Sequence, residues 1–185
     1  MAKQHGFYFD ADRCVLCRAC EVACKAVNNI ELGTKWIRVV EIWDGVYPNI
    51  NRAFLALVCM HCGKPSCIEA CLTRAISKRA IDGIVVVDRE KCTGSQGCRE
   101  CFSACPYGVP QFGEDGIMQM CDSCAGMNRE PACTACCPTE ALKFGVLEEL
   151  LEMAKEKGAR RMGGPTEPSV IVVGELPVDS SVTCS

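Results

Sequence analysis

The 185-residue sequence is poor in several residue types on which other classes of protein depend. It has only 11 aromatic residues (Trp 2, Tyr 3 and Phe 6) and 2 histidines, so a conventional aromatic core is thin and histidine-based catalysis has little to work with. No apolar run approaches the roughly 18 residues of a transmembrane helix. The N-terminal segment MAKQHGFYFDADRC contains neither an apolar signal core nor a cleavage site. These absences predict a chain that has no membrane span of its own.

Motifs for nucleotide binding or hydrolysis are also missing. The sequence has no glycine-rich dinucleotide fingerprint, no phosphate-binding loop, and no Ser–His–Asp or Cys–His set outside its clustered cysteines. Its formal net charge of -3, which counts every thiol as neutral, disfavours nucleic acid as a partner. We therefore predict no catalytic residues and no nucleic-acid partner.

Cysteine, in contrast, is abundant and regularly spaced. Sixteen of the 18 cysteines form four groups, here called motifs I to IV: Cys14, Cys17, Cys20 and Cys24; Cys59, Cys62, Cys67 and Cys71; Cys92, Cys98, Cys101 and Cys105; Cys121, Cys124, Cys133 and Cys137. Motif I has the C-x2-C-x2-C-x3-C spacing of bacterial ferredoxins, in which three thiolates bind one cubane cluster and the fourth ligates another. The spacing predicts that all sixteen are iron ligands of four [4Fe-4S] clusters, and hence electron transfer.

Two other uses of cysteine compete with this interpretation. A disulfide scaffold needs an oxidising compartment, and structural zinc sites take their ligands as two separated pairs. Three cysteines at successive x2 spacings instead wrap one corner of a cubane. The spacing favours iron–sulfur clusters over both alternatives, and the protein without its clusters should be poorly folded.

The chain repeats one local pattern four times. The β-prone runs GFYFDADRC, AFLALVC, GIVVVDREKC and GIMQMC each lead into a motif. After the third thiolate we predict one or two helical turns, over residues 18–25, 68–74 and 99–104. We predict an α+β fold made of two pseudo-repeated ferredoxin modules of the bacterial 2[4Fe-4S] type, with an insertion and a C-terminal helix plus tail.

The composition changes beyond Gly145. The segment VLEELLEMAKEKGARR predicts an amphipathic helix that Gly158 stops, with acidic residues at the start where the helix dipole favours them. The remainder is rich in Gly, Pro and Ser around one short strand, VIVV. This tail either wraps back onto the modules or lies along a partner subunit, and the sequence leaves both open.

The stretch from Gly6 to about Gly145 resembles the four-cluster electron-transfer (beta) subunit of the dimethyl sulfoxide reductase group of molybdenum and tungsten enzymes. WIRVVEIWDGVYPNINRAFLALVCMHC looks like that family's insertion before its second motif, DGIVVVDREKC like its entry to the third, and CPYGVPQFGEDG and REPACTACCPTEAL like its third and fourth exits. In that family motif I pairs with motif IV, and motif II with motif III. The resemblance implies these ligand sets: Cys14, Cys17 and Cys20 with Cys137; Cys121, Cys124 and Cys133 with Cys24; Cys59, Cys62 and Cys67 with Cys105; Cys92, Cys98 and Cys101 with Cys71.

The domains follow from this pairing. Residues 1–30 and 110–145 would form one module from motifs I and IV, and residues 31–109 a second from motifs II and III, with an insertion over residues 25–58. Residues 146–185 would form the C-terminal helix and an extended tail.

Several residues depart from the family's pattern or invite another interpretation. Five residues, TGSQG, separate Cys92 from Cys98 where the family usually has two, which predicts a bulged loop. The x3 spacing from Cys133 and the following Pro138 favour Cys137 as ligand, leaving Cys136 as a buried spare thiol. We expect Cys184 to be a free thiol. His61 would either donate a hydrogen bond to a cluster sulfur or, more often for such a residue, lie on a surface loop. For Trp36, Trp43 and Tyr47 we expect packing over the clusters or at an interface.

The resemblance implies a non-catalytic subunit that connects a molybdenum- or tungsten-pterin catalytic subunit to an electron donor or acceptor. A membrane quinone-reactive subunit or another redox protein would complete the complex. The absence of a signal favours the cytoplasm, where the partner could be a tungsten enzyme of the aldehyde oxidoreductase type, whose small subunits look similar. The alternative is a partner of the dimethyl sulfoxide reductase type at the periplasmic face of the membrane, after export with that signal-bearing partner. A free-standing polyferredoxin carrier, and a catalytic or sensing protein with one open iron, remain the other hypotheses.

Overall fold

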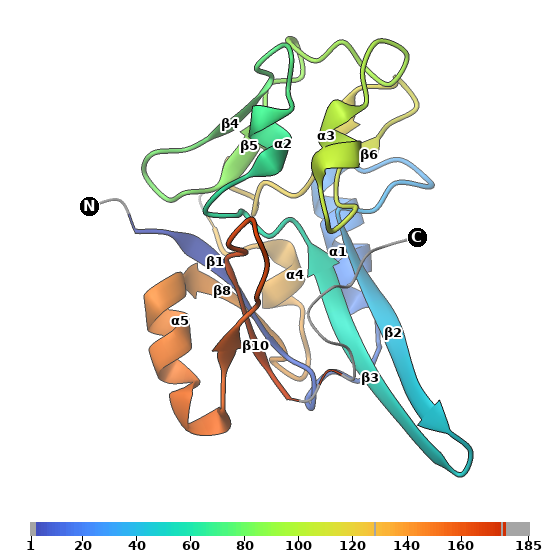
Figure 1. Cartoon of the computed structure of the whole chain (residues 1–185), viewed down its shortest axis with the longest axis vertical. Coiled ribbons are helices and arrows are strands. Elements are labelled where there is room, and N and C mark those ends of the chain that lie inside the picture. The colour runs from blue at the N-terminus through green and yellow to red at the C-terminus, as the bar shows by residue number, and fades with distance from the viewer. Residues whose placement is uncertain (1–2, 128, 175, 177–185) are drawn as a thin grey trace.

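The computed structural model describes residues 3–127, 129–174 and 176, and within them short strands and helices surround the cysteine loops (Figure 1). The strands form one four-stranded sheet and three two-stranded hairpins in this part of the chain. This is a mixed α/β arrangement of small sheets and short helices. Cys184 lies outside the described residues.

The four-stranded sheet pairs the first strand of the described chain with the last one. Its order is β8 (Leu142–Val146), β1 (His5–Asp10), β10 (Val170–Val173) and β9 (Arg160–Arg161). Strand β1 pairs antiparallel with β8 and parallel with β10. Gly6 is required here, because a Cβ would collide with the Ser169 carbonyl oxygen.

Alternate residues of the two central strands face different layers. Tyr8 and Ile171 point towards helix α5 (Leu147–Met153), where they pack on Leu147 and Leu150. Phe7, Phe9, Val170 and Val172 belong to the core that also contains the buried cysteines. Because both faces are covered, β1 and β10 are nearly continuous apolar runs.

The insertion forms a long antiparallel hairpin of β2 (Ile37–Val46) and β3 (Asn49–Val58). Its base is buried and its tip extends away from the rest of the chain (Figure 1). Trp43 is 60% exposed and Tyr47 84% exposed, so the expectation that these two pack over the clusters is wrong. Trp36 instead packs against the core that contains the buried cysteines.

Two short hairpins lie closer to the cysteines. Strand β4 (Ile76–Lys78) pairs with β5 (Val85–Val87), and β6 (Gln111–Phe112) pairs with β7 (Met118–Gln119). Strands β1, β3, β5 and β7 lead into motifs I to IV, which confirms the strands predicted before each motif.

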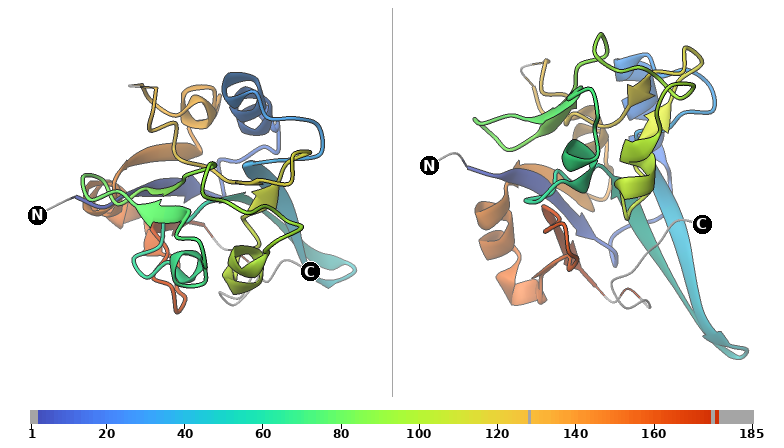
Figure 2. Two further views of the ribbon diagram at one scale, coloured as in Figure 1. Left: turned by 90° about the horizontal axis from the view of Figure 1, so that it is seen from above. Right: turned by 45° about the horizontal axis from the view of Figure 1, so that its top comes forward.

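The four cysteine helices lie in two pairs. Helix α1 (Ala19–Asn28) of motif I packs beside α4 (Ala132–Ala135) of motif IV, and α2 (Ser66–Glu69) of motif II packs beside α3 (Glu100–Ala104) of motif III (Figure 2). Helix α1 runs longer than predicted. The prediction of helix over residues 70–74 is wrong: α2 ends at Glu69, and Arg74 adopts φ 56° in the turn after Cys71.

The C-terminal helix is confirmed, and it continues into a 3-10 turn, η1 (Lys155–Lys157), that ends at Gly158 with φ 69°. The tail then returns to the body, since β10 pairs with β1. The sequence left open whether the tail packs back onto the rest of the chain or lies along a partner subunit, and the described part of the tail packs back. No helix in the described part of the chain has the length and apolar character that crossing a membrane requires.

Candidate iron–sulfur sites

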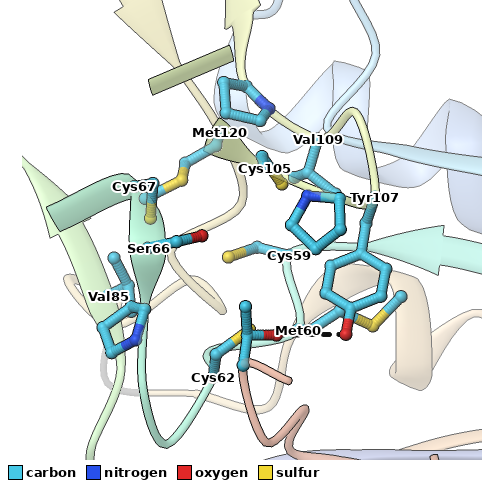
Figure 3. A pocket seen from close by; sticks show the side chains of 14 residues that line it. Cys59, Met60, Cys62, Ser66, Cys67, Val85, Cys105, Tyr107, Val109 and Met120 are labelled. Carbon is cyan, nitrogen blue, oxygen red and sulfur yellow. Dashed lines mark hydrogen bonds between the residues drawn. The ribbon is translucent and has the colours of Figure 1, made fainter. Parts of the chain in front are cut away.

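Three cysteines of motif II share a cavity with the last cysteine of motif III. Cys59, Cys62, Cys67 and Cys105 line a space of about 370 Å³ that is partly open to solvent (Figure 3). Apolar side chains, among them Val85, complete the wall. This is the grouping that the resemblance implies for these four residues.

The C-terminal tail covers this cavity. The Tyr107 hydroxyl and the Thr166 hydroxyl lie 3.1 Å apart within hydrogen-bonding distance, and both residues line the cavity. The backbone N–H groups of Gly63 and Lys64 donate to the carbonyls of Glu167 and Thr166. The tail therefore limits the access of water to the motif II loop, which is one of the factors that set cluster potentials.

A second cavity of about 330 Å³ is lined by Cys71, Cys92, Cys98 and Cys101. The long TGSQG loop does not remove Cys92 from this group. The Cys98 N–H donates to the Gly94 carbonyl at 2.8 Å, and the Ser95 N–H donates to the Gly116 carbonyl at 2.7 Å. These bonds fold the extra residues into a turn and return the chain to the cavity.

Motifs I and IV meet where α1 packs on α4. The Asn28 side-chain nitrogen lies 3.6 Å from the Cys24 sulfur and 3.9 Å from the Cys124 sulfur, so these two thiols are neighbours. Cys133 interacts electrostatically with both of them. Burial raises the pKa of Cys14, and a backbone hydrogen bond from Leu16 opposes this rise. Electrostatic interactions with Cys137 and Cys17 raise the pKa further, so the three sulfurs lie close together.

The last cysteines of motifs II and IV have the same surroundings. Burial acts to raise the pKa of Cys71 and of Cys137, but backbone N–H groups and a threonine hydroxyl two residues on outweigh it, so both pKa values are lowered. The Ala75 N–H donates to the Cys71 sulfur at 3.2 Å. The segments CLTRAI and CPTEAL share Cys, Thr and Ala at the same positions, and Arg74 and Glu140 both adopt positive φ.

Cys136 differs from Cys137 beside it. Its pKa is raised by burial and by Cys137, and its thiol lies 3.5 Å from the Cys133 carbonyl, to which it donates. It is half-buried. A thiol that donates a hydrogen bond keeps its proton, whereas an iron ligand is a thiolate. The Cys136 contact is therefore the one expected for a spare thiol, and Cys137 remains the predicted ligand.

The donors of these groups fit iron–sulfur clusters. Burial raises the pKa of Cys20 to about 12, that of Cys24 to about 11 and that of Cys67 to about 12. Such thiols ionise only when a metal replaces the proton. Among the described residues, no group of three or more His, Cys, Asp or Glu side chains is arranged tightly around the position of one single metal ion, as a zinc site would be. The cavities are instead lined by thiols, without histidine or carboxylate.

Neither interpretation of His61 is right. Its side chain is 0% exposed, so it is not on a surface loop, and both ring nitrogens have partners other than cluster sulfur. Nδ1 accepts the Val85 N–H at 3.1 Å, and Nε2 lies 2.7 Å from the Ser123 hydroxyl. Since Nδ1 is an acceptor, the proton of the neutral ring is on Nε2, which donates to Ser123. Burial, with a smaller contribution from Lys78, lowers the pKa of His61 to about 3.

Sequence reasoning missed Asn28, Ser123 and Thr166. For Asn28 a signal was present: it follows Cys20 and Cys24 at successive spacings of four, which places all three on one face of a helix. Ser123 and Thr166 gave no such signal, since their partners are distant in the sequence.

The fold and its thiol groups define a ferredoxin-type iron–sulfur protein. A family model described as a 4Fe-4S dicluster domain matches residues 50–147, and one described as a 4Fe-4S binding domain matches residues 5–26.

Curated relatives match over most of the chain. The sequence is 40% identical over 162 residues to the probable anaerobic dimethyl sulfoxide reductase chain YnfG of Escherichia coli K12, covering 81% of this chain and 77% of the relative. It is 34% identical over 184 residues to the formate dehydrogenase iron-sulfur subunit of Wolinella succinogenes, covering 85% of this chain and 89% of the relative. It is also 35% identical over 156 residues to the thiosulfate reductase electron transfer subunit PhsB of Salmonella typhi, covering 80% of this chain and 79% of the relative.

The chain belongs to the family of iron–sulfur electron-transfer (beta) subunits of the dimethyl sulfoxide reductase group of molybdenum and tungsten oxidoreductases. It is a non-catalytic subunit that binds [4Fe-4S] clusters and transfers electrons in an oxidoreductase complex with a catalytic partner. This confirms the family and the function that the resemblance implied.

Proposed function

We propose that the chain holds four [4Fe-4S] clusters in the ligand sets given above and carries electrons along them between a molybdenum- or tungsten-pterin catalytic subunit and a second redox partner. The observation that carries this proposal is the convergence of the cysteines. Two cavities are lined by cysteines of motifs II and III in the combinations that the resemblance implies, and motifs I and IV meet at α1 and α4.

The neighbours of each thiol support an order for the clusters. Cys133 interacts with Cys20, Cys121 with Cys59, and Cys67 with Cys101. Each cluster is named here by the motif that supplies three of its ligands. These electrostatic interactions between thiols support a line of clusters in the order I, IV, II, III. In the two-module division, residues 1–30 and 110–145 carry the first two and residues 31–109 the last two.

Iron and sulfide analysis of the protein purified without oxygen tests the number of clusters. Four cubanes require about sixteen iron atoms per chain. A value of about twelve would contradict the proposal and indicate that one set, with the Cys92 set as the first candidate, holds no complete cluster.

The partner is tested by purification of the native complex. The names of the relatives, dimethyl sulfoxide reductase and formate dehydrogenase, support a molybdenum or tungsten enzyme as the catalytic subunit. Metal analysis of the complex should find one of these two elements in a large co-purifying subunit. Elution as a single species of about the chain's own 20.1 kDa would instead support a free-standing polyferredoxin. The cytoplasmic location stays a prediction, which fractionation of the cell would test.

A further inference from the structure

Asn28 is the last residue of helix α1 and lies one turn after Cys24. Its side-chain nitrogen, Nδ2, makes three contacts: 2.9 Å to the Cys24 carbonyl oxygen, 3.6 Å to the Cys24 sulfur and 3.9 Å to the Cys124 sulfur. Cys24 comes from motif I and Cys124 from motif IV. One amide therefore spans the two segments that the proposed function assigns to a single cluster.

The contact with the carbonyl oxygen fixes the orientation of this amide. A carbonyl only accepts hydrogen bonds, so the atom of Asn28 facing it is the nitrogen and not the oxygen. One N–H of the amide is used by this bond, and the second remains for the two sulfurs.

Acidic residues lie on the other side of Asn28. The residue is half-buried and forms part of the wall of an open cleft of about 780 Å³, which is also lined by Glu31, Glu114 and Asp115. Arg89 is the cation of this wall, and it pairs with Asp115 at 2.5 Å. The Asn28 side chain therefore lines this acidic cleft and also contacts the thiols of Cys24 and Cys124.

We propose that Asn28 is the residue that sets the potential of the cluster bound by motif IV, by donating a hydrogen bond to its cysteine sulfurs. Reduction adds one negative charge that is shared by the cluster and its thiolates. A donor to sulfur stabilises the reduced state more than the oxidised state, and so raises the potential. This inference rests on the proposed ligand set of Cys121, Cys124 and Cys133 with Cys24.

The test is a redox titration of the purified native complex, followed by electron paramagnetic resonance. Asn28→Leu removes the donor at nearly constant volume. We expect the equilibrium between reduced and oxidised forms of one cluster to shift about tenfold towards the oxidised form, which corresponds to about 59 mV for a one-electron couple. The other potentials and the iron content should not change.

Asn29→Asp is the matched control. Asn29 is exposed and adjacent, and it adopts φ 49°, a conformation that Asp tolerates. A charge placed there should act weakly through solvent, whereas Asn28→Asp, which removes a donor and adds a charge at the sulfurs, should shift the potential more than Asn28→Leu. Equal shifts for Asn28→Asp and Asn29→Asp would overturn the inference.

A measurement on the unmodified protein covers the case in which Asn28 variants lose iron. With ¹⁵N placed only in asparagine side-chain amides, the reduced motif IV cluster should show a weak ¹⁵N coupling in pulsed electron paramagnetic resonance. If iron is complete and all potentials of Asn28→Leu equal those of the unmodified protein, or if the coupling is absent, Asn28 has no such role. A motif IV cluster missing from the unmodified protein would instead refute the proposed function.

Discussion

His61 and Ser123 occupy equivalent positions in motifs II and IV and hydrogen-bond to each other, with 2.7 Å between Nε2 and Oγ. Each directly precedes the second cysteine of its motif, and each has a positive φ, 40° for His61 and 57° for Ser123. Both are buried. The contact therefore joins the cysteine loop of motif II to the cysteine loop of motif IV.

Ser123→Ala should destabilise the protein. It leaves the buried Nε2–H of His61 without an acceptor, which costs about 1–3 kcal/mol. The measurement is the guanidinium concentration at which the iron–sulfur absorbance is lost without oxygen present, and the midpoint should fall. Ser77→Ala, at an exposed position of β4, is the control and should leave the midpoint unchanged. An equal midpoint for both variants would show that the junction carries no stability.

Cys136 and Cys137 should respond differently to replacement by serine. Cys137→Ser should lose one cluster, or about four iron atoms per chain, because the Cys137 sulfur faces N–H donors and adjoins Cys14. Cys136→Ser should keep all its iron, since the Cys136 thiol only donates to a nearby carbonyl. Iron analysis decides this. The opposite result would exchange the roles of the two residues.

Cys92→Ser should also remove about four iron atoms per chain. The loop turn at Gly94 returns Cys92 to the cavity that Cys71 and Cys101 line, despite the five-residue spacing. Gln96→Ser is the control, at an exposed position of the same loop that does not line the cavity. Full iron content and an unchanged cluster spectrum in Cys92→Ser would contradict the assignment of this ligand.

Ile171→Ala should lower the stability by about 2–5 kcal/mol, the usual cost of emptying a fully buried aliphatic site. Ile171 is 0% exposed, and it packs with Tyr8 and Leu150 between the sheet and α5. Leu151→Ala, at a residue that is 39% exposed, is the control and should cost much less. Denaturant unfolding of the loaded protein measures both. Equal costs would mean that the tail strand does not contribute to the core.

Local features of the fold followed from the sequence. The strands before each motif were predictable because each apolar run ends at the first cysteine, and the C-terminal helix was predictable because its apolar spacing, its acidic start and Gly158 agree. The end of α2 was not predictable. After Glu69 the chain turns so that backbone N–H groups point at Cys71, and the residues of this turn, which include Leu72 and Ala70, do not by themselves disfavour helix.

The burial of His61 and the docking of the tail depended on distant residues. His61 looked like a loop residue because its partners, Val85 and Ser123, are far from it in the sequence. The strand VIVV was visible, but its parallel pairing with β1 was not, because no local pattern distinguishes a strand that returns to its own sheet from one that binds another chain.

The sequence alone determined the chemistry. It contains four groups of thiols, and the spacing within a group lets a short loop present three of them to one corner of a cubane. This geometry is local, because it depends only on the few backbone residues of the loop. The tertiary structure decided which groups adjoin, where the fourth cysteines lie and which side chains reach the sulfurs. These depend on contacts such as α1 with α4, Asn28 with Cys124 and His61 with Ser123, which form only when segments far apart in the chain pack together.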